Sequence, residues 1–290
     1  MNDEPSMFEL GANRYGKSRI RLVTVRRHPD RHDLRDLTVD VALEGDFTAA
    51  HVDGDNTNLV ATDTMKNTVY AFARDRLPGP AEAFGLELAR HFAAEPQVDR
   101  ALVTLRELAW RRIPLGAGEA PDAFIRSGEF TRVAIVAATK TGASVEAGIE
   151  DVTVMKTTRS AFRGFERDRY TTLAETDDRL MATKITALWG YGETAAEAGF
   201  DFDSAFERAR STLLTVLAEH FSPSVQTSIW IMATAMLEAE PSIDWVRMVL
   251  PNLHHWTVNL EPFGLDNPGI VFVSTTEPHG LIDATVRRSV

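Results

Sequence analysis

The sequence predicts an α+β protein built from two tandem units, each with the element order ββααββ. Two observations support this fold class. The expected helices are gathered in pairs between pairs of expected strands, whereas βαβ units would alternate them one by one. The chain also has 290 residues, a length at which one hydrophobic core usually divides into two domains. We therefore expect an antiparallel sheet with a helix pair in each half.

The first half shows two strands, two helices and two further strands. Residues 20–25 are rich in β-branched side chains and residues 37–43 alternate apolar and polar side chains, which indicates a strand pair. In chain order, we expect strands 20–25 and 37–43 joined by the polar loop His28–Asp36, a helix capped by Thr62 or Asp63 and ended by Pro78, a helix through Phe84 and Phe92 that stops before Pro96, and strands 101–110 and 133–138 around a loop containing Pro114, Gly116, Gly118 and Pro121.

The second half repeats this order. Ser222-Pro223-Ser224 is a typical helix start, because serine accepts hydrogen bonds from the free amides of a first turn. In chain order, we expect strands 152–156 and 185–189, a helix through Phe206 and Leu217, a helix from Ser224 to Pro241, and strands 246–249, 256–260, 271–274 and 282–286.

The boundary between the two halves is expected in the stretch Thr139 to Gly148. This stretch is rich in glycine and has only a weak hydrophobic pattern, as domain boundaries often do. We place the boundary near residue 140, which divides the chain into domains 1–140 and 141–290.

Composition excludes several classes of partner and chemistry. The 31 Lys and Arg against 42 Asp and Glu give a net charge of -11, which repels nucleic acid and anionic lipid surfaces. The absence of cysteine excludes disulfides, thiolate nucleophiles and iron–sulfur ligation. No apolar run approaches the roughly 20 residues of a membrane span, and the amino terminus is acidic rather than signal-like. We expect a cytoplasmic protein with neither a nucleic-acid nor a membrane partner.

Common cofactor motifs are also missing. No glycine-rich dinucleotide fingerprint and no P-loop is present, and the eight histidines include no HExxH spacing. No serine lies in a GxSxG elbow. We therefore expect no cofactor, no metal site and no hydrolase triad.

One segment, Val60 to Thr68, combines a strand end, a helix start and several hydroxyl groups. Its Thr62 and Asp63 are typical capping residues, which is a purely structural interpretation. The same helix start is also a place where an anion or a polarised oxygen binds. Lys17, in Tyr15-Gly16-Lys17, lies just before a strand and is by itself consistent with a solvated lysine.

Several separated motifs together resemble the urate oxidase, or uricase, family. The shared motifs are Tyr15-Gly16-Lys17, Val60 to Tyr70, Phe162-Arg163-Gly164-Phe165, Arg167 to Leu173, Asp178-Arg179, Ser224-Val225-Gln226, Leu250 to His254 and Glu277 to Leu281. They occur in the family's order and approximate spacing from about Tyr15 to Arg288. Agreement among so many motifs is far more specific than any single one.

The resemblance implies a function and an assembly. Urate oxidases oxidise urate with dioxygen and water to 5-hydroxyisourate and hydrogen peroxide, with neither metal nor organic cofactor. The implied fold is the tunnelling fold, in which two ββααββ domains contribute antiparallel sheets that close into a barrel when subunits assemble. The implied assembly is a homotetramer with its sites at subunit interfaces, and barrel closure would remove exposed sheet edges.

The resemblance also implies which residues bind urate. Arg179 and Gln226 match the pair that grips the purine edges, Phe162 matches the aromatic residue that stacks on the ring, and Val225 and Asp63 match further hydrogen-bonding positions. Taken singly, each has a structural explanation. Arg179 fits a surface ion pair, Gln226 a helix first turn and Phe162 a core side chain.

A second set of matches implies a proton relay. Lys17, Thr62 and His254 match its members, and Asn252 matches the residue beside the dioxygen position. Singlet urate and triplet dioxygen do not combine directly, so urate must first lose a proton and become electron-rich. A general base and an ordered oxygen position are therefore what the protein has to supply.

Two departures and two alternatives accompany this interpretation. Arg163 stands where many relatives carry tryptophan, and the carboxyl terminus lacks a Ser-Lys-Leu peroxisomal signal, which favours a bacterial-type cytoplasmic enzyme.

A tunnelling-fold enzyme acting on a pterin or GTP would anchor its ligand with glutamate and usually bind a metal, so Gln226 and the missing cysteines argue against it. A purine-binding protein without catalysis would keep the binding residues Arg179, Gln226 and Phe162. It would not need the relay residues Lys17, Thr62 and His254, all of which are present.

Overall fold

The computed structural model describes residues 8–77 and 79–289. The acidic amino-terminal residues 1–7, Val290 and Pro78, which was expected to end a helix, lie outside the described residues. The chain divides into two compact units. The first unit contains the residues through Gly128 together with 132–147 and 192–202, and the second contains 129–131, 148–191 and 203–290. The boundary expected at residue 140 stays a prediction.

The first unit contains a sheet of sequential strands. β1 (Tyr15–Arg27), β2 (His32–Gly45), β3 (Val98–Pro114) and β4 (Glu119–Ala138) lie side by side in this order. The pairs β1–β2 and β2–β3 are antiparallel. The alternation predicted for residues 37–43 is confirmed, because Leu37, Val39, Val41 and Leu43 are all at most 2% exposed.

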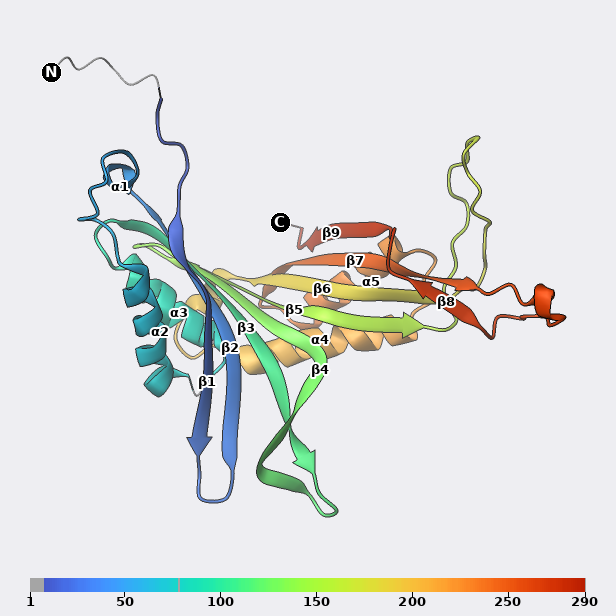
Figure 1. Ribbon diagram of the computed structural model, residues 1–290, viewed down its shortest axis with the longest axis horizontal. Helices are drawn as coiled ribbons and strands as arrows, with labels where there is room; N and C mark the ends of the chain where they lie inside the picture. The colour runs from blue at the N-terminus through green and yellow to red at the C-terminus, as the bar shows by residue number, and fades with distance from the viewer. Residues whose placement is uncertain (1–7, 78, 290) are drawn as a thin grey trace. The chain divides into compact units, whose positions relative to one another are not determined.

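Helices cover this sheet. α1 (Thr48–Val52) is one short turn, whereas α2 (Thr62–Arg76) packs on β1 and α3 (Ala81–Ala93) packs on β3 (Figure 1). The apolar positions of α3 recur at helical spacing, since Phe84, Leu88 and Phe92 are all at most 1% exposed. The short 3-10 helix η1 (Glu193–Ala196) also belongs to this unit.

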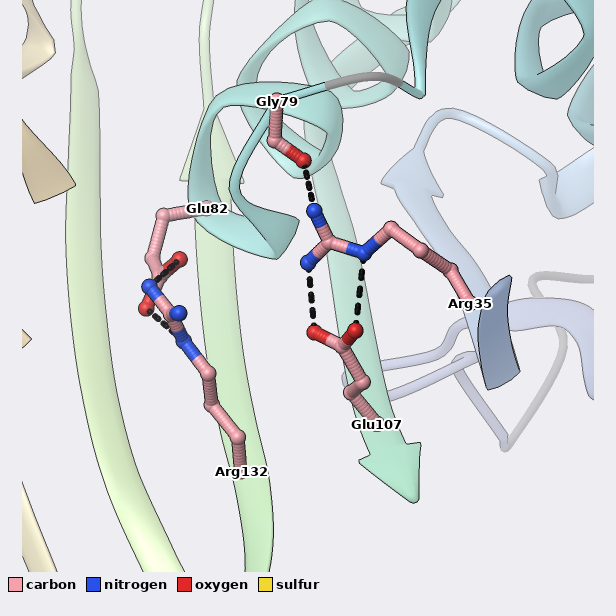
Figure 2. Close-up of polar contacts among 5 residues, drawn as sticks. All are labelled: Arg35, Gly79, Glu82, Glu107 and Arg132. Atoms are coloured by element: carbon pink, nitrogen blue, oxygen red, sulfur yellow. Dashed lines mark hydrogen bonds and ion pairs between the residues drawn. The ribbon is translucent and has the colours of Figure 1, made fainter. Parts of the chain in front are cut away.

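Two ion pairs join α3 and its preceding loop to the strands of the first unit (Figure 2). Arg35 in β2 binds both carboxylate oxygens of Glu107 at 2.7 and 2.6 Å and also donates to the Gly79 carbonyl. Arg132 in β4 binds both oxygens of Glu82, at 3.1 and 2.8 Å, and Glu82 is fully buried. A carboxylate in this position requires a cationic partner.

The second unit has the same plan. Its strands are most of β5 (Ala143–Lys156), then β6 (Met181–Tyr191), β7 (Ile243–Thr257), β8 (Phe272–Thr275) and β9 (Leu281–Arg287). β7 is the central strand, because it pairs antiparallel with β6, β8 and β9. α4 (Phe202–Glu219) and α5 (Val225–Ala239) form the helix pair, and α5 packs on β7 and β9 (Figure 1). The 3-10 helix η2 (Glu261–Phe263) lies in the β7–β8 hairpin loop.

The expected order of two strands, a helix pair and further strands is therefore confirmed in both halves, but several boundaries were wrong. Residues His32 to Asp36, which were expected in a loop, belong to β2. Pro121 lies inside β4, and the turn before it is short, with the Leu115 amide donating to the Gly118 carbonyl at 2.9 Å. Most of the stretch 139–148 belongs to β5. The strands expected at 246–249 and 256–260 are one continuous strand, in which Pro251 still pairs by register with Leu281. A proline in a strand removes one N–H donor, but the pairing of β7 with β6 continues on both sides of Pro251.

The expected cap of α2 was also wrong. Ala61 occupies the capping position and no side chain caps this helix. Thr62 and Asp63 are its first two residues instead. Asp63 accepts hydrogen bonds from Lys66 and, at 3.0 Å, from Asn67, so its carboxylate faces side chains one turn ahead. Among the residues described, no helix is long and apolar enough to cross a membrane.

Candidate functional site

A cavity of about 1410 Å³ lies in the second unit. It is lined by the end of β5 and the residues up to Phe162, the segment 172–180, the start of α5, the end of β7 with its hairpin, and Ile282 of β9. Its lining includes six of the residues that the sequence indicated, namely Phe162, Arg179, Val225, Gln226, Asn252 and His254. The structure thus brings together residues that are up to 92 positions apart in the sequence.

Arg179 presents a guanidinium group without a carboxylate partner to this cavity. The ion pair with a neighbouring aspartate that the sequence also allowed does not form, because Asp178 accepts from the Thr158 hydroxyl at 2.7 Å and Asp177 pairs with Arg163 at 2.5 Å. The Nε of Arg179 is buried and has no hydrogen-bond partner within the described part of the chain. Burial lowers the pKa of Arg179. An acceptor that enters the cavity therefore meets an unsatisfied cationic donor.

Phe162 lies beside this arginine. Its ring centroid is 5.2 Å from the Arg179 guanidinium carbon, and its backbone forms an antiparallel bridge with Thr176. Phe165 stacks on Phe162 with ring centroids 5.0 Å apart and planes 11° apart. Phe165 belongs to the motif Phe162-Arg163-Gly164-Phe165, but no role was predicted for it from the sequence. The two stacked rings support a flat apolar wall in the cavity.

The start of α5 supplies polar groups. Ser224 caps the helix, because its side chain accepts from the Thr227 amide at 3.1 Å. The amides of Val225 and Gln226 precede Thr227 and have no carbonyl partner inside the helix. Val225 is buried and the Gln226 side chain is exposed to the cavity. This end of a helix carries partial positive charge and favours an anionic ligand.

The end of β7 contributes the last two predicted residues. The Asn252 amide donates to the Gly280 carbonyl at 2.7 Å, which fixes the strand where its side chain lines the cavity. His254 stacks on Trp256, with ring centroids 5.3 Å apart and planes 21° apart. Trp256 also lines the cavity and was not identified from the sequence. The alternation of β7 places residues 254 and 256 on one face, which is the sequence signal that could have identified Trp256.

The first unit holds the other three predicted residues. Lys17 is half-buried on β1 opposite Val41, immediately before a bulge that extends to Ile20. Arg19 in this bulge has a left-handed φ of 58°, and its amide donates to Asp40 at 2.6 Å. Only glycine fits at position 16, because a Cβ there would lie 1.9 Å from the Val41 carbonyl oxygen. These features fix the backbone on both sides of Lys17.

Thr62 and Asp63 lie at the start of α2, and β1 positions this helix start. The Val60 amide donates to the Tyr15 hydroxyl at 2.7 Å, and burial raises the pKa of Tyr15. The hydrogen bond from Lys66 holds the pKa of Asp63 below its ordinary value, and the charge of Lys17 contributes to this shift. Lys17, Thr62 and Asp63 are thus grouped at one end of α2.

Candidate metal ligands do not gather in the described residues. Among residues 8–77 and 79–289, no group of three or more His, Cys, Asp and Glu side chains is arranged to hold a metal ion. The polar side chains that line the cavity include one guanidinium, one carboxylate, two amides, two imidazoles and several threonine hydroxyls.

Two tandem groups of antiparallel strands, each with a helix pair inserted after its first two strands, define a protein of the tunnelling-fold class. Comparison with known proteins supports this fold class and identifies one family within it. The sequence profile of the uricase family matches residues 13–137 and 145–283. The chain belongs to the uricase family.

Individual relatives extend along nearly the whole chain. A uricase from Arthrobacter globiformis is 44% identical over 280 residues, which are 96% of this chain and 90% of the relative. A uricase from Dictyostelium discoideum is 37% identical over 287 residues, or 98% of this chain and 99% of the relative. The crystal structure of the Arthrobacter globiformis uricase superposes with a TM-score of 0.91 at 43% identity, covering 98% of this chain and 96% of that one.

Proposed function

We propose that the cavity of the second unit binds urate and that the residues grouped around Lys17 complete the site for its oxidation. The reaction itself follows from family membership, because uricases are oxidoreductases that oxidise urate with dioxygen. Urate, dioxygen and water give 5-hydroxyisourate and hydrogen peroxide, which balances all atoms. The observation that carries the assignment of the site is that six residues named from separate motifs line one cavity.

Binding relies on two polar edges and one flat wall. The Arg179 guanidinium offers parallel N–H donors to a carbonyl and a ring nitrogen of urate, and the Gln226 amide offers one donor and one acceptor to the opposite edge. Phe162, backed by Phe165, stacks on the purine ring. The Val225 amide and Asp63 bind the remaining polar atoms. The positive end of α5 also favours the anionic form of urate.

Chemistry relies on proton transfer and on the placement of dioxygen. Lys17 and Thr62 accept and pass on a proton of urate, so that the ring becomes electron-rich enough to give electrons to dioxygen one at a time. His254 completes the relay, and its stacking on Trp256 holds the imidazole plane. Asn252 binds the dioxygen, and later the water or peroxide, above the ring.

Assembly and location are part of the same proposal. We propose a homotetramer in which Lys17, Thr62 and Asp63 of one subunit face the cavity of a neighbouring subunit. In the first unit, β1 pairs only with β2 within the part of the chain that the structure describes, so its other edge has N–H and C=O groups free for a second subunit. The cysteine-free composition supports a cytoplasmic location.

The two alternatives are less well supported. The family profile and the solved uricase both match the two halves of the chain, which disfavours a pterin- or GTP-directed enzyme. A non-catalytic purine-binding protein would not need the conjunction of Lys17, Thr62 and His254.

One assay tests the function directly. Protein dialysed against EDTA is mixed with urate, and the loss of urate absorbance is measured together with the release of hydrogen peroxide. We expect both signals in equal amounts and unchanged by dialysis. Activity that disappears with EDTA and returns with a divalent ion would contradict the metal-free mechanism, and the absence of both signals would contradict the function.

A further inference from the structure

A buried hydroxyl network lies behind the cavity and has no part in the chemistry described above. It consists of His220, Ser222 and Ser228, and both serines are fully buried. His220 Nε2 is 2.8 Å from Ser228 Oγ, and Ser228 Oγ is 2.7 Å from Ser222 Oγ. His220 Nδ1 is 2.7 Å from the Val216 carbonyl oxygen, which only accepts, so Nδ1 carries the hydrogen and Nε2 of a neutral ring accepts from Ser228.

One end of this network holds the segment that carries Phe162. The Ser222 amide donates to the Arg159 carbonyl at 2.9 Å, and the Ala161 amide donates to the Ser222 carbonyl at 2.8 Å. Ser160 lies between these contacts, and its own carbonyl accepts from the Arg179 amide at 2.8 Å. The backbones that carry Phe162 and Arg179 are therefore both fixed to Ser222.

The other end of the network holds the start of α5. The hydroxyl oxygens of Ser222 and Ser228 lie 3.2 and 3.1 Å from the Ser224 carbonyl oxygen. Ser228 donates its single hydrogen to His220, so Ser222 is the hydroxyl that can donate to this carbonyl. Ser224 is the capping residue of α5, and Val225 and Gln226 follow it directly. The segment of Phe162 thus contacts the Ser222 backbone, the Arg179 backbone joins that segment through Ser160, and the start of α5 contacts the Ser222 hydroxyl.

We infer that His220, Ser222 and Ser228 are positioning residues that set the geometry of the urate-binding groups. The inference rests on the proposed function of the cavity. A buried hydroxyl that loses its partner is expensive, so the segments would shift to satisfy it. A displacement of about 1 Å at Arg179 or Gln226 is enough to weaken edge-on hydrogen bonds to a planar ring.

The test uses xanthine, a purine that lacks the C8 oxygen of urate, as a non-reactive probe. Its Kd is measured by calorimetry, together with kcat and KM for urate, on the full-length protein. We expect Ser228→Ala to raise the Kd of xanthine about fivefold to tenfold, with a similar rise in KM and a smaller change in kcat. Ser211→Ala is the matched control, because this exposed α4 hydroxyl donates to the Glu207 carbonyl at 2.7 Å within its own helix. It should leave the Kd unchanged.

Histidine variants separate positioning from mere packing. His220→Leu should weaken xanthine binding as much as Ser228→Ala does, whereas His220→Gln keeps a polar atom near the Nε2 position and should restore the Kd to within about twofold of wild type. The double variant with Ser228→Ala and His220→Leu should be no more than about twofold worse than either single variant, because the residues act as one network.

The possible results distinguish a failure of the positioning inference from a failure of the proposed function. A lower Tm with an unchanged xanthine Kd in Ser228→Ala and His220→Leu would show a purely structural network and overturn the inference while the proposed function stands. If Ser228→Ala does not fold, the half-buried His220 supplies the decisive pair of variants. Wild-type protein that neither binds xanthine nor oxidises urate would overturn the proposed function, and the inference with it.

Discussion

At the scale of single residues, two arginines from neighbouring segments have opposite surroundings. Arg163 is exposed, and the hydrogen bond to Asp177 raises its pKa, with Glu175 3.6 Å away as a second partner. Arg179 is partly buried and has an Nε without an acceptor among the described atoms. Arg163 is thus neutralised at the surface, while the guanidinium of Arg179 can bind a ligand.

This contrast gives a matched pair of variants. Arg179→Ala should raise the Kd of xanthine by roughly 10²-fold, because it removes charge-assisted bonds and leaves one edge of the purine unpaired. Arg163→Ala should change the Kd less than about twofold, since exposed ion pairs contribute little. Calorimetry on both variants checks this. Equal effects of the two substitutions would show that the ligand binds elsewhere.

Substitutions of Lys17 and Thr62 are expected to change kcat rather than the Kd of a bound purine. Lys17→Ala or Thr62→Ala should lower kcat by about 10²-fold or more, because a general base acts mainly in reaching the activated state. The xanthine Kd should change much less. The double variant should be little slower than the worse single variant, because both residues serve one proton relay.

Stopped-flow measurement of urate loss gives these rates. Lys184→Ala is the control, since this half-exposed lysine pairs with Asp151 at 2.5 Å on the surface and should leave kcat unchanged. Near-wild-type turnover in Lys17→Ala would remove the relay from the mechanism.

Glu146 in β5 makes stability depend on pH. Burial raises the pKa of its carboxyl group, and the nearby charge of Arg100 opposes this shift only in part. Between the unfolded and the folded pKa, the folded protein therefore holds more protons than the unfolded chain. The contribution of Glu146 to stability is greatest below the unfolded pKa of about 4.3 and is lost as the pH rises through the folded value.

Replacing Glu146 with an uncharged residue should remove the loss of stability that its ionisation causes. We expect Glu146→Gln to have a higher Tm than wild type at pH 7, with the difference shrinking as the pH falls towards 4. Glu119→Gln changes an exposed carboxylate and should leave the Tm nearly unchanged. Calorimetric scans over this pH range check both variants. A difference that does not vary with pH would rule out ionisation as its cause.

At the scale of elements, periodicity predicts strands where one face is buried. The strand at 37–43 is confirmed because its apolar side chains alternate strictly. The sequence predicted too many strands at the end of the second unit, because Pro251 interrupts the hydrophobic pattern although the pairing of β7 with β6 continues on both sides of it. Short pieces such as α1 and η2 have no burial pattern that would reveal them.

The cavity shows a similar limit. Its residues come from segments that no periodicity relates, so resemblance to a family, and not pattern, identified six of them. Phe165 and Trp256 were missed because an aromatic side chain that stacks on another ring has the same sequence signal as one in the core.

The packing of α3 on the first sheet depends on the buried pair of Arg132 and Glu82 (Figure 2). Arg132→Leu leaves the carboxylate buried without this partner and should lower the free energy of unfolding by about 3–5 kcal/mol. The double variant with Glu82→Met should recover most of the loss. Urea denaturation measures both.

An exposed pair provides the comparison. Arg247→Leu breaks the pair with Asp283, whose side chain is 41% exposed, and should change the free energy of unfolding by less than about 1 kcal/mol. If Arg132→Leu cost no more than Arg247→Leu, the buried pair would not stabilise α3.

At the scale of the whole molecule, the proposed site draws on both units. Lys17, Thr62 and Asp63 belong to the first unit, whereas the cavity belongs to the second. Among the described residues β1 pairs only with β2, so the proposed closed barrel would require a second chain. In this proposal, the shared sites and the assembly follow from the same architecture.

Mixed oligomers test this sharing. Lys17→Ala and Arg179→Ala, each nearly inactive alone, should regain activity when refolded together. An isologous pair of unlike chains contains two sites. One site carries both substitutions and the other carries neither, so half of the sites in this pair are intact. Random mixing makes about half of the pairs unlike, so about a quarter of all sites should be active. Differently tagged chains and a double pull-down show whether mixed oligomers have formed. If they form and the mixture is no more active than its components, all residues of a site come from one chain and the shared-site proposal is wrong.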